Sequence, residues 1–254
     1  MKRLLCAALF CSIVLSACAN DDSGNFLAKD DSTGYQDDDP IKDVKYIPPC
    51  ADECEYGVLE DKRDGHTYRT VKIGDQVWMA DDLDYRTSEK MWYEGYGDCV
   101  ENIYGDCVHH GLYYTWIEAI DSAGTYDKYG IKCGYNDACD LPQPLQGICP
   151  EGWHLPSYDE FDELYHAMGE NYKAMQATGF SSWKNATDAY GFSALPAGYI
   201  SAVNGDLDGL GTNLGYWTSS ITDGRVESWY VHSTSFGHTI DNRYIGYMVR
   251  CIQD

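Results

Sequence analysis

A short acidic run near residue 205 has the residue types and spacing of a calcium-binding loop. Asn204, Asp206 and Asp208 place oxygen ligands at alternate positions, and Gly209 follows where such a loop turns sharply. However, Gly215 occupies the twelfth position, where an EF-hand loop requires a bidentate glutamate. Turn chemistry alone also explains Asn, Asp and Gly here. The sequence therefore leaves two interpretations, a calcium site completed from elsewhere and a plain turn, and it indicates no other cofactor.

Two further clusters of reactive side chains lack the spacing that catalysis or metal binding requires. One is the set of histidines His109, His110, His232 and His238. No carboxylate or cysteine falls at a recognisable metal-motif spacing from them, so we expect them on the surface. The other is the set of carboxylates Asp159, Glu160, Asp162 and Glu163. Glycosidase carboxylates lie about 5 to 10 Å apart across a cleft, whereas these are expected to cap a helix and line its solvent face.

Aromatic side chains are abundant, with 7 Trp and 22 Tyr in the chain. Flat exposed rings stack on sugar faces and also anchor protein interfaces. The adjacent pairs Trp92-Tyr93 and Trp229-Tyr230 are the candidates for such a binding surface. The alternative, which we favour for most tryptophans, is that they fill a core short of aliphatic residues. The tryptophans concerned are Trp78, Trp116, Trp153, Trp217 and Trp229.

The N-terminus has the layout of a secretory signal, with Lys2 and Arg3 before an apolar run over residues 4–15 that is too short to span a bilayer. The run ends in Leu-Ser-Ala-Cys at residues 15–18, which resembles a bacterial lipobox. That resemblance implies removal of residues 1–17 and lipidation of Cys18 as the first mature residue. Ala19 and Asn20 follow in place of the aspartate that retains such proteins at the inner membrane, so we expect an outer-membrane lipid anchor. The alternative is an ordinary signal peptide cut at the small residues.

Composition separates a tether from one folded domain. Residues 18–56 are rich in Asp, Ser and Gly with little apolar periodicity, which predicts an extended, solvated spacer. Residues 57–254 suit a single domain. The net charge is −23, with 41 acidic against 18 basic residues, so we expect no nucleic-acid partner and favour neutral glycans or basic protein surfaces.

The cysteines of an exported chain are expected to form disulfides. Eight cysteines besides Cys18 remain after the signal, and eight allow 105 pairings in principle. Local spacing favours three pairs and leaves Cys149 to meet Cys251. The three local pairs are Cys50–Cys54, Cys99–Cys107 and Cys133–Cys139. A zinc site at Cys50 and Cys54 is the alternative for the first pair.

Short strands and a few helices are expected to position these residues. Alternation over residues 67–73, a Gly74-Asp75 turn and residues 76–79 predict a β-hairpin. Further strands are predicted at residues 191–200, 215–220, 226–232 and 246–252. Helices are predicted over residues 114–122, from residue 158, and briefly over residues 171–177. The second helix has Ser157 as its cap, Glu160 to close a capping box, and one apolar face. That face comprises Phe161, Leu164, Tyr165 and Met168.

Six separated segments, in order, resemble the Fibrobacter succinogenes major paralogous domain. They are residues 64–85, 111–116, 147–157, 192–199, 216–220 and 249–251. The resemblance runs from about residue 57 to residue 254, and such domains typically occur on exported bacterial lipoproteins.

A weaker resemblance is to the C-type lectin fold and to formylglycine-generating enzymes. It rests on residues 152–157, which lead into an acidic helix, and on a cysteine before that helix paired with one in the terminal strand. The calcium triplet of sugar-binding lectins and the cysteine pair of the enzymes have no counterpart, so no catalytic residue is carried over. We therefore predict a disulfide-stapled, C-type lectin-like α+β domain with short antiparallel strands and two or three helices. We expect it to be a non-catalytic module, periplasmic or surface-exposed, that binds a neutral glycan or another surface protein. The alternative is an enzyme of the related fold or a hydrolase.

Overall fold

The computed structural model describes residues 54–86, 99–134 and 139–254, and it confirms the predicted α+β class. Its largest sheet has five strands in the order β1-β2-β3-β12-β6, with antiparallel pairing throughout. The strands are β1 (Tyr56–Glu60), β2 (Thr67–Ile73), β3 (Gln76–Met79), β12 (Ile252–Gln253) and β6 (Trp153–His154). The last strand of the chain therefore lies in the middle of a sheet that begins with the first.

The predicted hairpin forms at the bounds expected from the sequence. Ile73 pairs with Gln76, so Gly74 and Asp75 make the two-residue connection. Gly74 has φ +63°, a left-handed conformation that glycine adopts without strain. Burial follows the alternation over most of β2, with Tyr68, Val71 and Ile73 buried, although Thr70 beside Val71 is buried as well.

A second sheet has three antiparallel strands in the order β11-β10-β9. The strands are β9 (Asn213–Thr222), β10 (Arg225–His232) and β11 (Ser235–Asp241). The first two include the predicted strands and extend them, whereas β11 was not predicted, because its sequence reads as polar. Two small hairpins complete the strands. They are β4 (Cys99–Glu101) with β5 (Cys107–His109), and β7 (Tyr199–Ile200) with β8 (Leu207–Asp208).

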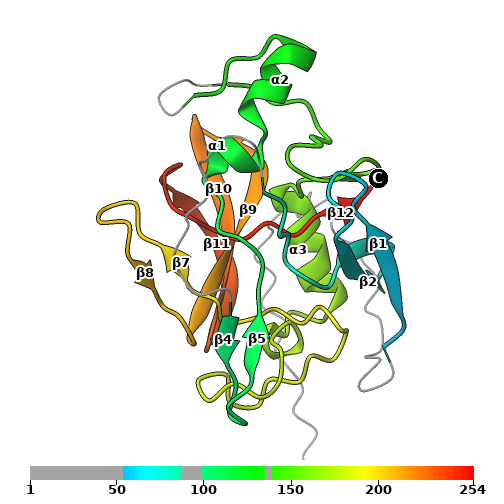
Figure 1. Ribbon diagram of the computed structural model, residues 1–254, viewed down its shortest axis with the longest axis vertical. Helices are drawn as coiled ribbons and strands as arrows, with labels where there is room; N and C mark the ends of the chain where they lie inside the picture. The colour runs from blue at the N-terminus through cyan, green and yellow to red at the C-terminus, as the bar shows by residue number, and fades with distance from the viewer. Residues whose placement is uncertain (1–53, 87–98, 135–138) are drawn as a thin grey trace, which may run out of the picture. The chain divides into compact units, whose positions relative to one another are not determined.

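Helix α3 (Tyr158–Ala167) is the main helix and is capped as predicted. The Ser157 side chain accepts from the Glu160 amide, and the Glu160 carboxylate accepts from the Ser157 amide at 2.7 Å. Phe161 and Leu164 are buried. The ring of Phe161 lies between the two larger sheets, 4.8 Å from Trp78 of β3 and 5.7 Å from Tyr216 of β9. Figure 1 shows α3 between the β9–β10–β11 sheet and strands β1 and β2.

The other helices differ from the prediction over residues 114–122 and 171–177. Helix α1 is only Trp116–Ala119, because Asp121 has φ +45° and breaks the helical backbone. Asp121 then caps a separate helix, α2 (Ser122–Tyr129), which was not predicted. The expected third helix is a 3₁₀ turn over Tyr172–Ala174. None of the helices in the described residues is long and apolar enough to cross a membrane.

Two predicted strands are largely wrong. Of residues 191–200, only Tyr199–Ile200 forms a strand, because Gly191, Ser193 and Gly198 all have left-handed φ values that interrupt extended backbone. Of residues 246–252, only Ile252 lies in a strand. The preceding residues form single bridges to three different segments, through Gly246, Tyr247 and Met248.

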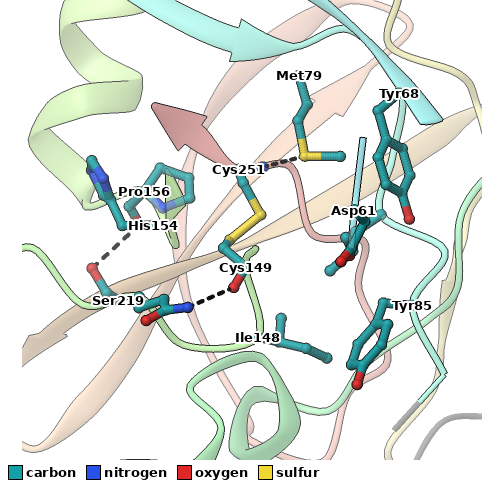
Figure 2. The surroundings of a disulfide bond; sticks show 12 residues. Asp61, Tyr68, Met79, Tyr85, Ile148, Cys149, His154, Pro156, Ser219 and Cys251 are labelled. Atoms are coloured by element: carbon teal, nitrogen blue, oxygen red, sulfur yellow. Dashed lines mark hydrogen bonds between the residues drawn. A yellow bond between two sulfur atoms is a disulfide. The ribbon is translucent and has the colours of Figure 1, made fainter. Parts of the chain in front are cut away.

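Three of the predicted disulfides are present: Cys99–Cys107, Cys133–Cys139 and Cys149–Cys251. Cys54 is also disulfide-bonded, and Cys50 lies outside the described residues. The Cys149–Cys251 bond joins the segment before β6 to the residue before β12, with a Cα–Cα distance of 5.9 Å. Figure 2 shows this bond beside Met79, whose sulfur accepts from the Cys251 amide at 3.3 Å.

Candidate functional site

A cavity of about 420 Å³, lined by both apolar and charged side chains, lies where five parts of the chain meet. We call it the His110 pocket. Its walls are residues 66–69 at the start of β2, Ala80, Asp81, Asp82 and Asp84 after β3, residues 108–111 at the end of β5, residues between 177 and 195, and Arg250. Its volume falls in the range of small-molecule sites.

A buried ion pair forms one wall of the pocket. Arg250 donates from Nε to Asp82 Oδ1 at 2.9 Å, and its Nη1 donates to the Phe192 carbonyl. The guanidinium also lies over the Phe192 ring, 4.4 Å from its centroid. Burial alone would lower the pKa of Arg250, but the charge of Asp82 raises it above its ordinary value. Arg250 therefore stays protonated and is fixed against Asp82.

Two buried acceptor atoms of the pocket residues have no hydrogen-bond partner within the described residues. They are His110 Nε2 and Asp82 Oδ2. His110 is 8% exposed, and its Nδ1 lies 2.7 Å from the Gly111 carbonyl. Because a carbonyl can only accept, Nδ1 carries a proton, and in the tautomer protonated at Nδ1 alone Nε2 is an acceptor. The Asp82 carboxylate also interacts with the Tyr216 hydroxyl. Burial raises the pKa of Tyr216, the charge of Arg250 lowers it, and the charge of Asp82 raises it further.

Gly111 allows the segments that carry these two residues to meet at the pocket. A Cβ at this position would lie 2.3 Å from the Leu83 carbonyl oxygen and 2.8 Å from that of Asp82. The Leu112 amide also donates to the Leu83 carbonyl at 2.9 Å. Only a residue without a side chain allows the segment after β5 to lie this close to the segment after β3.

The remaining charged side chains of the pocket are held by partners. Asp188 accepts from the Ser193 amide at 2.7 Å and from its hydroxyl at 2.6 Å. Burial raises the pKa of Asp188, and these hydrogen bonds oppose the shift. Arg69 pairs with Asp81 at 2.6 Å at the partly exposed rim. The pocket walls thus carry more carboxylates than guanidinium groups. The carboxylates are Asp81, Asp82, Asp84 and Asp188, and the guanidinium groups are Arg69 and Arg250.

The predicted calcium residues lie elsewhere, on the β7–β8 hairpin. Asn204 and Asp206 bond to each other within the turn, and Asp208 is in β8, paired with Tyr199. Across residues 54–86, 99–134 and 139–254, no group of three or more His, Cys, Asp or Glu side chains is arranged to hold a metal ion. The bonds between Asn204 and Asp206 are those of an Asx turn, and a calcium site at these residues stays a prediction.

The prediction of an exposed aromatic surface is wrong for Trp229. This side chain is 3% exposed, because β10 directs it into the core, where it stacks on Phe236 at 4.6 Å and on Tyr158 at 5.4 Å. Tyr230, the next residue of the strand, is half-buried on the opposite face, against Gly237. Trp92 and Tyr93 lie outside the described residues.

The surface position expected for His110 is also wrong, since it is buried in the pocket. Asp82 and Arg250 were not predicted as site residues either. Both lie within segments that carry the family resemblance, residues 64–85 and 249–251. Their place in segments that resemble the family could have marked them as candidate site residues. Nothing in the sequence indicated that the two segments lie close together in the fold.

Fold and site together define a disulfide-stapled α+β domain with a ligand-sized pocket that carries several charged side chains. Residues 71–253 match the family model of the Fibrobacter succinogenes major domain, and the chain belongs to this family. No curated protein and no solved structure matches the chain. The likeness to C-type lectins therefore stays a prediction.

Proposed function

We propose that the chain is a lipid-anchored protein of the cell envelope whose folded domain is a non-catalytic binding module. The His110 pocket is its ligand site, and the ligand is a neutral, hydroxyl-rich glycan. One observation carries the proposal: His110 lines the pocket, is nine-tenths buried, and has a ring nitrogen, Nε2, that no described part of the protein satisfies. A buried polar atom without a partner is costly, and a ligand donor would remove that cost.

The chemistry of the walls favours sugar hydroxyls over other ligand groups. A hydroxyl donates one hydrogen bond and accepts others, so it can use both the acceptors and the guanidinium groups of the pocket. An anionic ligand would meet the excess of carboxylates at Asp81, Asp82, Asp84 and Asp188. Tyr68 and Phe180 add apolar ring surface to the walls.

The anchor is part of the same proposal. The basic start, the apolar run and the lipobox-like residues 15–18 support cleavage after residue 17 and acylation of Cys18. More than one acyl chain gives stable membrane attachment. Residues 18–56 would then hold the binding domain away from the outer membrane.

An enzymatic role has less support from the side chains present. Every cysteine in the described residues is disulfide-bonded, so an oxidase would have no reactive thiol among them. Asp82 is committed to Arg250, and both oxygens of Asp188 accept from Ser193. These carboxylates are fixed as structural and ligand-facing groups.

The test is calorimetric titration of the full mature chain with cello-, xylo- and manno-oligosaccharides. We expect binding to at least one series. His110→Ala should weaken it by about 10-fold, the worth of one buried hydrogen bond. His110→Gln, which keeps an acceptor, should weaken it less. His232→Ala is the control, because His232 lies outside the pocket walls. Absence of binding to all three series, or equal affinity of the His110→Ala and native chains, would refute the proposal, and capture of a protein partner would favour the alternative ligand class.

A further inference from the structure

The tip of the β4–β5 hairpin displays an aromatic ring to solvent. Tyr104 is 78% exposed, and the adjacent Ile103 is 58% exposed. Figure 1 shows the hairpin formed by β4 and β5 at the lower end of the domain, beside the yellow-green loops. Tyrosine has a large apolar ring with a polar end, so it favours positions where one face contacts a ligand.

The turn that carries Tyr104 is held rigidly. Asn102 Oδ1 accepts from the Tyr104 amide at 2.9 Å and from the Asp106 amide at 3.0 Å. Directly behind the turn, the Cys99–Cys107 disulfide joins the two strands, with a Cα–Cα distance of 5.4 Å. A ring presented on a preorganised turn loses little backbone freedom when it binds a ligand.

The same turn lies against a wall of the His110 pocket. The Ile103 amide donates to the Gly179 carbonyl at 2.8 Å, and a Cβ at Gly179 would lie 3.8 Å from the Tyr104 ring. Thr178 and Phe180, on either side of Gly179, line the pocket. Strand β5 then runs from Cys107 to His109, next to His110. The path from Cys107 to His110 is about 10 Å at the usual rise per residue, and Tyr104 lies three residues further along the turn.

We propose that Tyr104 is a sugar-stacking subsite that extends the His110 pocket, so that the ligand is an oligosaccharide. The inference rests on the proposed function. One sugar ring of the oligosaccharide occupies the pocket and donates a hydrogen bond to His110. A later sugar ring of the same oligosaccharide stacks on Tyr104. A single exposed tyrosine ring beside the His110 pocket fits an oligosaccharide better than a protein partner. A protein interface would need a larger apolar patch. The nearby Glu101 and Asp106 also disfavour an acidic polysaccharide.

The experiment compares a monosaccharide with its hexaose in the same full-length protein, for example glucose with cellohexaose. The native chain should bind the hexaose more tightly. Tyr104→Ala should reduce hexaose affinity by about 5- to 10-fold and leave monosaccharide affinity unchanged, as expected for loss of one stacking contact. Tyr104→Phe should behave as the native chain, because the ring remains. Tyr126→Ala is the matched control, since Tyr126 is exposed on α2 and does not line the pocket.

The variants distinguish the Tyr104 stacking subsite from the proposed glycan-binding function of the His110 pocket. His110→Ala should weaken monosaccharide and hexaose alike, because both place a ring in the pocket. If the native chain binds sugars but Tyr104→Ala changes nothing, the stacking subsite is overturned and the binding function stands. If the native chain binds neither glucose nor cellohexaose, nor the xylose and mannose counterparts, both proposals are overturned.

Discussion

Arg250 and Asp82, which lie 168 residues apart in the chain, form a fully buried ion pair in a wall of the His110 pocket. Arg250 directly precedes Cys251, whose disulfide fixes the terminal segment to Cys149. The pair therefore links the end of the chain to the segment after β3. It also orients the carboxylate that presents Oδ2 without a partner among the described residues.

Breaking this pair from one side should destabilise the domain strongly. Arg250→Met leaves the Asp82 carboxylate buried and uncompensated, for which we expect a loss of about 3–5 kcal/mol in the free energy of unfolding. Asp82→Asn leaves Arg250 without its counter-charge and should cost a similar amount. Urea denaturation of the full chain measures both. The double variant Asp82→Asn with Arg250→Met should cost clearly less than the sum, and strict additivity would show that the two charges do not depend on each other.

The long-range disulfide should contribute more stability than a local one. In the chain-entropy account, the sequence separation of 102 between Cys149 and Cys251 is worth about 4–5 kcal/mol. The separation of 6 between Cys133 and Cys139 is worth only about 2 kcal/mol. Replacing each pair with alanine and comparing urea midpoints tests the difference. Both Cys149 and Cys251 are fully buried, so the lost side chains add to the larger effect. Equal losses from the two pairs would contradict the expectation.

The parts of the fold that could be predicted are those set by local chemistry. The β2–β3 hairpin and α3 follow from alternation, from the Gly74 turn and from the Ser157–Glu160 capping box. Such signals lie within a few residues of one another. The strand predictions over residues 191–200 and 246–252 were largely wrong. The backbone of these segments is set by several distant partners and by residues with left-handed φ values, which an apolar pattern does not reveal.

The pocket could not be predicted for the same reason. Its central contacts join residues that are far apart in the chain, as Arg250 is from Asp82. His110 read as a surface histidine because its burial depends on the contact that Gly111 permits with Leu83. Nothing in the sequence distinguished Trp229 from Tyr230. Only the orientation of β10 determines that the ring of Trp229 is buried and that of Tyr230 is half-buried.

His154 should make stability depend on pH in a defined direction. Its Nε2 lies 2.8 Å from Glu160 Oε1, and its Nδ1 lies 2.8 Å from Asp254 Oδ1. Burial alone would lower the pKa of His154, but Glu160 and Asp254 raise it above the ordinary 6.5. In the folded protein the imidazole therefore holds its proton to higher pH than in the unfolded chain. Its contribution is fully present below the unfolded value and is lost as pH rises through the folded value.

The matching experiment follows thermal unfolding of native and His154→Gln chains across pH. The native chain should be the more stable one below about pH 6, by about 2 kcal/mol for hydrogen bonds to charged groups, and the difference should shrink as the solution becomes alkaline. Asp254→Asn should remove part of the difference, because Glu160 remains as a partner. At strongly acidic pH the stability difference should disappear, because protonation of Glu160 breaks its ion pair with His154. Burial alone would raise the pKa of Glu160, but His154 and Ser157 hold it below its ordinary value, so this loss occurs only at low pH. A constant difference at all pH values would argue against an ionised His154.

Ionisation of Glu118 should destabilise the folded protein, in contrast to that of a carboxylate held by an ion pair. It is 6% exposed in α1, where Oε2 accepts from the Thr115 amide at 2.8 Å and Oε1 has no partner within the described chain. Burial raises the pKa of Glu118 to about 7, against a smaller opposing effect of the Thr115 hydrogen bonds. Between the unfolded value of 4.5 and the folded value, the native state binds the extra proton. Stability must therefore fall as pH rises through this window.

Glu118→Gln removes that fall, because the amide carries no charge and its oxygen can still accept from Thr115. One unit of pKa shift corresponds to about 1.4 kcal/mol, so at about pH 8 the variant should be more stable than the native chain by about 3 kcal/mol. At about pH 4 the two should unfold at the same urea concentration, since Glu118 is then protonated in both states. Glu163→Gln is a matched control on α3, where the carboxylate is less buried and its pKa is raised by burial together with the charges of Asp75 and Glu160. Its effect should be smaller. If Glu118→Gln is no more stable than the native chain at alkaline pH, then Glu118 Oε1 has a partner in the folded protein that neutralises its charge.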